Sequence, residues 1–160
     1  MKRGSTIFLQ IVLILLGLGV LAFLIFMPQF EGRNANATQF EVYFKDPFLA
    51  YIYVASVPFF VGLYQGLKIL GYARRNEIFV ERSVRSFRII KLCALIVAVF
   101  ILGAEAYIFI FIRGTDDIAG GVMMGVFVLF VCAVIGTAAA VFERVLQNAV
   151  EIKSENDLTI

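Results

Sequence analysis

Four long apolar runs constrain the fold of this chain more than any other feature of its sequence. They extend over about residues 6–27, 48–70, 89–112 and 118–142. Each run is long enough to cross ~30 Å of hydrocarbon as a helix that rises ~1.5 Å per residue. A helix satisfies its backbone polar groups internally, as lipid requires of any segment that spans it. The sequence therefore predicts an all-α membrane protein, with residues 1–160 in a single membrane domain.

The basic residues are divided unevenly among the segments that connect these runs. Of the 14 Lys and Arg residues, eleven lie at the N-terminus, between residues 68 and 91, or after residue 142. Because Lys and Arg accumulate on the cytoplasmic side of membrane proteins, this bias predicts a four-helix antiparallel bundle with both termini in the cytoplasm. The connecting segments are then an outer loop at 28–47, a cytoplasmic loop at 71–88 and a cytoplasmic tail at 143–160.

Glu105 is an acidic residue well inside the third run, about four residues outward of its midpoint. A charge at the centre of a membrane helix costs ~2.5–3.5 kcal/mol on insertion scales, so this side chain should face the bundle interior or be protonated. At its depth the neighbouring runs supply Ala55, Ser56 and Val126. None of these is basic, so an ion pair does not explain the carboxyl group.

Two interpretations of this carboxyl group remain open. In the first, Glu105 responds to protons or cations and lines a small outward-facing cavity, a role that intramembrane ionisable residues often have. In the second, it is a protonated structural residue that forms hydrogen bonds with Tyr51, Tyr53 or Ser56. Both interpretations define the same candidate site, which consists of Glu105, Ser56, Tyr51 and Tyr53.

A second polar group is expected near the cytoplasmic face. Gln10, Gln65 and Lys68 lie at similar depths at the inner ends of the first two runs, so they can form an inner polar cluster. For Lys68 the plainer alternative is that its long side chain extends to the lipid headgroups.

The cytoplasmic loop and the start of the third helix are rich in arginine. The residues concerned are Arg74, Arg75, Arg82, Arg85 and Arg88. Apolar residues at helical spacing predict that this helix begins near Glu77 or Val80. Glu81 and Arg85 have the i,i+4 spacing of a favourable ion pair. This basic stretch is expected to contact anionic lipid, or to form a docking surface for a cytoplasmic partner.

Small residues mark two places where helices can approach closely. Gly62 and Gly66 form a small-xxx-small pattern in the second run. The fourth run carries a stripe that includes Gly121, Gly125 and Gly136. This stripe is expected to pack against the rest of the bundle or against a second copy of the chain, which would make a homo-oligomer.

The sequence lacks the usual signatures of an enzyme. It contains no histidine, so an imidazole base and histidine ligands for a metal are absent. It also has no Cys-x-x-Cys pair, no glycine-rich phosphate loop and no second carboxylate at the depth of Glu105. We therefore expect no enzyme, no cofactor, no bound metal and no direct contact with nucleic acid.

Several segments of the sequence together resemble one bacterial family. They are the start Met1–Thr6, the segment Pro58–Phe60, the turn Asp116–Asp117 and the ending Ile152–Ile160. On these segments the whole chain resembles the family of unknown function numbered 2975 (DUF2975), and the terminal Glu-Asn-Asp-Leu-Thr-Ile is the most specific part. The resemblance implies a small four-span protein of the bacterial inner membrane. It also implies pairing with a small helix-turn-helix regulator of the Cro/repressor type.

These observations lead to one leading functional hypothesis and two alternatives. The leading hypothesis is a non-enzymatic membrane sensor or regulatory protein, or an immunity-like protein, that acts with the cytoplasmic regulator. The first alternative is a small transporter or channel that uses Glu105 as its intramembrane carboxylate. The second is a structural membrane subunit whose small-residue seams bury a partner helix.

Overall fold

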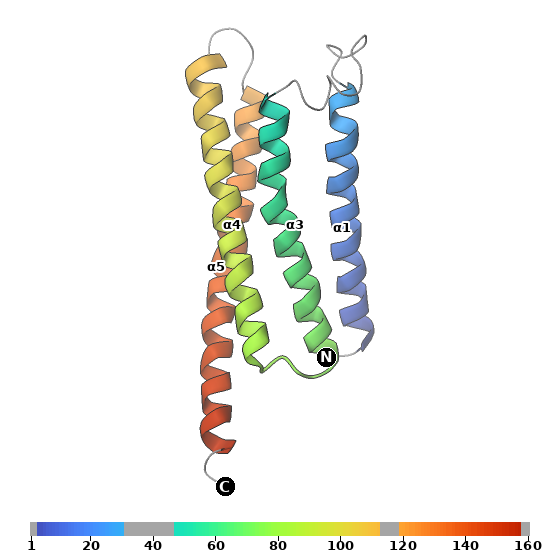
Figure 1. Cartoon of the computed structure of the whole chain (residues 1–160), viewed down its shortest axis with the longest axis vertical. Coiled ribbons are helices and arrows are strands. Elements are labelled where there is room, and N and C mark those ends of the chain that lie inside the picture. Colours follow the sequence, from blue (N-terminus) through green and yellow to red (C-terminus); the bar gives the residue numbers. More distant parts are fainter. Residues whose placement is uncertain (1–2, 31–46, 113–118, 158–160) are drawn as a thin grey trace.

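The computed structural model describes residues 3–30, 47–112 and 119–157. Within these ranges every regular element is helical, and none is a strand. In chain order the elements are α1 (Arg3–Phe30), α3 (Pro47–Arg74), α4 (Glu81–Tyr107), the π-helix η2 (Ile108–Ile112) and α5 (Ala119–Asp157). Figure 1 shows the four long helices lying side by side along the length of the molecule.

All four helices are long and apolar enough to cross a membrane. The segments that meet this criterion are Gly4–Phe26, Leu49–Arg74, Glu81–Phe111 and Ala119–Asn156. Large apolar side chains cover the outside of the helices instead of filling a core, with Phe8 67% and Met123 75% exposed. Such a surface suits lipid as the solvent. The predicted all-α fold with four membrane-length helices is confirmed.

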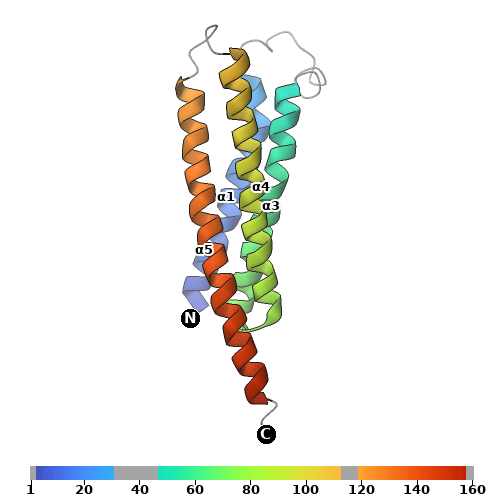
Figure 2. The ribbon, with the colours of Figure 1, turned by 90° about the vertical axis from the view of Figure 1, so that its left-hand side faces the viewer.

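Each helix packs mainly against its neighbour in the sequence. α4 has its most extensive interface with α5 and a smaller one with α3, while α1 packs on α3. The start of α1, the connection between α3 and α4, and the end of α5 lie at the same end of the molecule (Figure 1). We call this the basic end, because it carries Arg74, Arg75 and the arginines at the start of α4. The last turns of α5 project beyond the other helices in both ribbon views (Figure 2).

Two tyrosines of α3 connect it to the helices on either side. The Tyr51 hydroxyl donates a hydrogen bond to the Phe100 carbonyl oxygen of α4, at 2.6 Å. The Tyr53 hydroxyl donates to the Leu24 carbonyl oxygen of α1, at 3.0 Å. In lipid no hydrophobic force drives helices together, and interhelical hydrogen bonds contribute to their association together with van der Waals packing. α3 therefore holds the two halves of the bundle together.

The small residues lie at helix contacts within this chain. In α3, a Cβ on Gly62 would contact Cys93 of α4, whereas one on Gly66 would contact Leu13 of α1. The two glycines of the small-xxx-small pattern therefore face different neighbours. In α5, a Cβ on Gly121 would contact Ile108 of η2, whereas Gly125 and Gly136 face α4. Gly125 of this stripe is buried and Gly136 is half-buried in the bundle, whereas Gly121 is exposed. The packing of the stripe against a second copy of the chain stays a prediction.

α3 ends in a Schellman motif, in which Asn76 takes the position usually held by glycine. Asn76 has a φ of 59°. Its N–H donates to the Ala73 carbonyl at 3.2 Å, and the Glu77 N–H donates to the Tyr72 carbonyl at 2.9 Å. These are the two bonds that define the motif. Asparagine tolerates the left-handed conformation better than other residues with a Cβ.

Replacing Asn76 by glycine should therefore leave the free energy of unfolding nearly unchanged, while alanine should lower it by ~1–2 kcal/mol. Denaturant titration in mixed micelles measures both variants. Asn148→Ala, at an exposed helical position of α5, is the matched control and should cost almost nothing. Equal losses for Asn76→Ala and Asn76→Gly would show that the backbone conformation at Asn76 does not determine the effect.

Candidate functional site at the interface of α4 and α5

The Glu105 side chain fills a notch in α5 that exists because residue 125 is glycine. Glu105 is half-buried and Gly125 is buried. A Cβ on Gly125 would lie 2.6 Å from Glu105 Cδ and 3.2 Å from Cγ, and would overlap the carboxyl oxygen Oε1. The oxygen therefore lies directly against the Cα of Gly125, where a weak Cα–H···O contact can form. The position next to Val126 agrees with the depth expected from the sequence.

The predicted hydrogen bonds to Glu105 are absent. Within the described part of the chain, no hydrogen bond or ion pair reaches its carboxyl group. Tyr51 and Tyr53 donate to carbonyl oxygens of α4 and α1, and the Ser56 hydroxyl donates to the Tyr53 carbonyl at 2.7 Å. The prediction for these three hydroxyls is wrong. A serine within a helix readily bonds to the preceding turn, and the tyrosines reach the backbone of the adjacent helices.

The helix changes its geometry just after Glu105. The N–H of Ile108 is shared between the carbonyl oxygens of Ala104 and Glu105, and residues 108–112 then form a π-helix. Residues in π-helical geometry are rare in proteins. Gly103, two residues before Glu105, lies against Tyr51 of α3. The Tyr51 hydroxyl oxygen is 2.7 Å from the position that a Cβ on Gly103 would take. Close contacts with both α3 and α5 therefore fix the backbone around Glu105.

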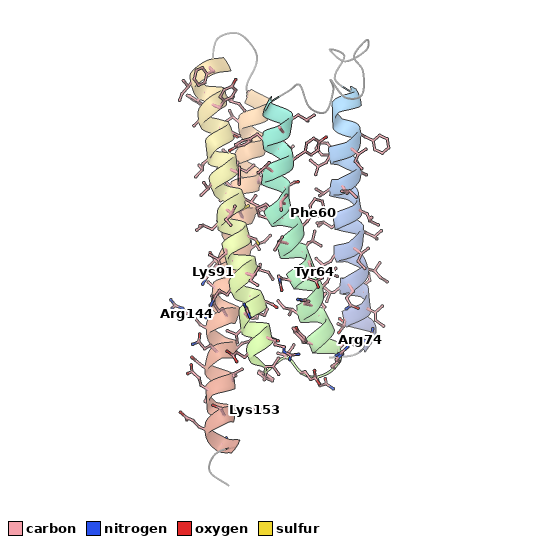
Figure 3. All side chains as sticks on the ribbon, in the orientation of Figure 1. Phe60, Tyr64, Arg74, Lys91, Arg144 and Lys153 are labelled. Carbon is pink, nitrogen blue, oxygen red and sulfur yellow. The ribbon has the colours of Figure 1, made fainter. Side chains whose placement is uncertain are left out.

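A second carboxylate, Glu143, forms an ionic cluster that the sequence interpretation did not anticipate. Arg88 Nε lies 2.7 Å from Glu143 Oε1, and Lys91 Nζ lies 2.6 Å from Oε2. The Glu143 side chain is 9% exposed, against 55% for Arg88 and 39% for Lys91. The carboxylate is thus buried in the α4–α5 interface, while both cations remain in contact with the surroundings. Figure 3 shows Lys91 beside α5 at this level.

The predicted inner polar cluster is arranged differently. The Ser86 hydroxyl of α4 lies 3.1 Å from Gln65 Oε1, so the partner of Gln65 lies in α4. Lys68 Nζ lies 4.8 Å from the centre of the Tyr64 ring in its own helix, in a cation–π contact. Among the described residues, Gln10 forms no hydrogen bond with either side chain. The expected grouping of Gln10, Gln65 and Lys68 is therefore wrong.

The five arginines of the basic end fall into two groups. Arg74 and Arg75 line a surface pocket with Ile7 at the start of α1, and Figure 3 shows Arg74 between α3 and α1. The other three line a groove between α4 and α5, and they are Arg82, Arg85 and Arg88. Among the ion pairs of the described residues there is none between Glu81 and Arg85, so that prediction is wrong.

The four membrane-length helices and the carboxyl group in their interface define a small polytopic α-helical membrane protein. The sequence profile of the family described as "Protein of unknown function (DUF2975)" matches residues 31–160, and the chain belongs to that family. It is also similar to "Uncharacterized membrane protein YoaS" of Bacillus subtilis (strain 168), with 38% identity over 161 residues that cover 100% of both chains. No solved structure matches the chain. The predicted family is confirmed.

Proposed function

We propose that the protein is a non-enzymatic sensor or regulatory protein of the bacterial cell membrane that acts with a small cytoplasmic helix-turn-helix regulator. One observation carries this proposal: α5 is a single helix of 39 residues. It begins near the Gly125 notch, which holds Glu105, and ends beyond the other helices at the basic end (Figure 2). The same helix therefore links the intramembrane carboxyl group to a projecting surface.

We place the basic end in the cytoplasm. Arginines gather at this end, and Lys153 lies on the projecting part of α5 (Figure 3). Cytoplasmic segments of membrane proteins carry such an excess of Lys and Arg. In this orientation the projecting end of α5 meets cytoplasmic proteins, and Glu105 lies in the outer half of the bundle.

The proposed signal acts on the packing of α4 against α5. Protonation of Glu105, or a cation bound to it, changes the charge inside the notch. If two arrangements of α4 and α5 accommodate the charged and the neutralised notch unequally, this change shifts the equilibrium between the two arrangements. Interfaces between packed helices switch between discrete arrangements by shifts of ~1–2 Å. Because α5 is continuous, such a shift at Gly125 also moves its projecting end.

The binding of the regulator tests this function directly. The full chain in lipid nanodiscs is titrated with purified small helix-turn-helix proteins of the Cro/repressor type, the class of partner that the family resemblance implies. Ile152 is 61% exposed on the projecting end, so Ile152→Ala should weaken binding about tenfold, as expected for an interface anchor. Ile135→Ala removes the same groups from the lipid-facing part of α5, where Ile135 is 47% exposed, and should leave the affinity unchanged.

Two results would count against the proposal. One is a regulator that does not bind the wild-type chain, and the other is an equal effect of the two isoleucine substitutions. A small transporter is the alternative, and the lack of a hydrogen-bond partner for Glu105 among the described residues favours it. That alternative predicts a proton or cation flux in liposomes that Glu105→Gln abolishes.

A further inference from the structure

An open groove of about 820 Å³ lies between the first turns of α4 and the projecting half of α5. Its α4 wall carries Glu81 followed by the arginines Arg82, Arg85 and Arg88. Its α5 wall includes Gln147, Val150 and Glu151. The three arginines follow one another at intervals of three residues, so their side chains lie along one face of the helix. The groove therefore has one wall formed largely by guanidinium groups.

The groove carries more positive than negative charge, because its three arginines outnumber the two carboxylates that line it. Arg82 and Arg85 are exposed, and neither side chain forms an ion pair in the described ranges. Arg88 uses its Nε for Glu143, which leaves its two terminal nitrogens available. On the opposite wall, one carboxyl oxygen of Glu151 accepts a hydrogen bond from Gln147, at 3.3 Å. The groove thus presents several guanidinium N–H donors outside any ion pair, beside the two carboxylates of Glu81 and Glu151.

The groove continues from this charged part toward the membrane-facing surface of α4. Ile89 and Leu92 also line it, and Leu92 is 50% exposed. A helix needs ~20 residues to cross the hydrocarbon core of a membrane. If Phe111 marks one boundary of the core, the other boundary lies near Leu92. The arginines then lie at the level of the lipid headgroups, and the apolar residues lie where acyl chains begin.

We propose that this groove binds one anionic phospholipid, with the phosphate between Arg82 and Arg85 and an acyl chain along Ile89 and Leu92. The planar guanidinium group pairs with phosphate oxygens in bidentate fashion, which suits this wall. Basic pockets between membrane helices bind phospholipid headgroups in the same way. A free phosphate ion would use the arginines but not the apolar part. The inference goes beyond the proposed function, because it requires neither a signal nor a regulator.

Lipid binding to the purified full chain in neutral detergent tests this site, with bound lipid counted by native mass spectrometry. Phosphatidylglycerol should bind at least about tenfold more tightly than phosphatidylcholine with the same acyl chains. The double substitution Arg82→Gln/Arg85→Gln should weaken the binding of phosphatidylglycerol about tenfold or more. Arg74→Gln/Arg75→Gln removes the same charge from the same end outside the groove and should change the affinity less than about twofold.

A displacement experiment with water-soluble anions distinguishes a lipid site from a site for a free anion. Inorganic phosphate and glycerophosphoglycerol, which carry the charge without acyl chains, should not displace phosphatidylglycerol. Displacement by either one at comparable concentration would assign the groove to a soluble anion and overturn the proposal. The proposal would also be overturned if the two lipids bound equally well, or if the two double variants lost the same affinity for phosphatidylglycerol. Either result would show only a diffuse attraction of anionic lipid to the basic end.

Discussion

Replacing Gly125 by alanine should destabilise the bundle by ~1–2 kcal/mol, although alanine is the better helix former. The new Cβ would overlap Glu105 Oε1, so the carboxyl group would have to leave the notch or α4 and α5 would have to separate. Overpacking of this kind costs ~1–3 kcal/mol, and the gain in helix propensity of up to ~1 kcal/mol offsets only part of it. Denaturant titration in mixed micelles measures the free energy of unfolding.

A matched control and a double-mutant cycle assign this loss to the contact itself. Gly120 lies in the same helix with nothing within 4 Å of its Cβ position, so Gly120→Ala should be neutral or slightly stabilising. Removing the carboxyl group by Glu105→Ala vacates the space that the new Cβ needs. Gly125→Ala should then cost little in the Glu105→Ala background, with a coupling energy of at least about 1 kcal/mol. A coupling energy near zero would contradict the notch.

Removing both cations from Glu143 should destabilise the bundle by ~3–5 kcal/mol, the cost of a buried charge left without a partner. Arg88 and Lys91 each hold one carboxylate oxygen, at 2.7 and 2.6 Å. After Arg88→Met or Lys91→Met alone, the remaining cation still neutralises the carboxylate, and a loss of only ~1 kcal/mol is expected. The double variant should therefore lose more than the sum of the single variants.

The exposure of the three side chains predicts an asymmetry within this cluster. Glu143→Gln leaves two cations that are 55% and 39% exposed and can be solvated, so it should cost only ~1–3 kcal/mol. Adding Glu143→Met to the double cation variant should recover most of the lost stability, because no charge remains buried. Arg144→Met removes an exposed charge next to the cluster and serves as the control. Equal losses for this control and Lys91→Met would contradict the role of the cluster.

The membrane-length helices follow from the sequence because lipid leaves few choices to an apolar run. A run of the required length must form a helix, and consecutive runs joined by short connections must lie antiparallel. The depth of Glu105 beside Val126 follows from the same geometry, and the structure places its carboxyl group against the adjacent Gly125. These features depend on helical rise alone, so no knowledge of side-chain packing is needed.

Partners of individual side chains were harder to predict, because they depend on how each helix is rotated about its axis. The hydroxyls of Tyr51 and Ser56 had nearby backbone carbonyls as competing acceptors, and they bond to those instead of Glu105. The Glu143 cluster did leave a signal in the sequence. If Glu105 lies opposite Val126 in an antiparallel pair, then Glu143 lies opposite Arg88.

The proposed function depends on one physical link, between the notch at Gly125 and the projecting end of α5. A pair of spin labels reports on it, with one at Phe79 in the α3–α4 connection and one at Ile152 in the projecting end. Both residues are exposed, at 55% and 61%. The labels are attached to Phe79→Cys and Ile152→Cys in a chain that also carries Cys93→Ala and Cys132→Ala.

Electron–electron distance measurements in nanodiscs then compare Gly125→Ala with Gly120→Ala in this labelled chain. Gly125→Ala should shift the distance distribution by at least about 1–2 Å, the size of a helix shift at an interface. Gly120→Ala should leave the distribution where it is, and Glu105→Ala should restore it in the presence of Gly125→Ala. Identical distributions in all of these proteins would show that the notch and the projecting end are not linked, and would contradict the proposed function.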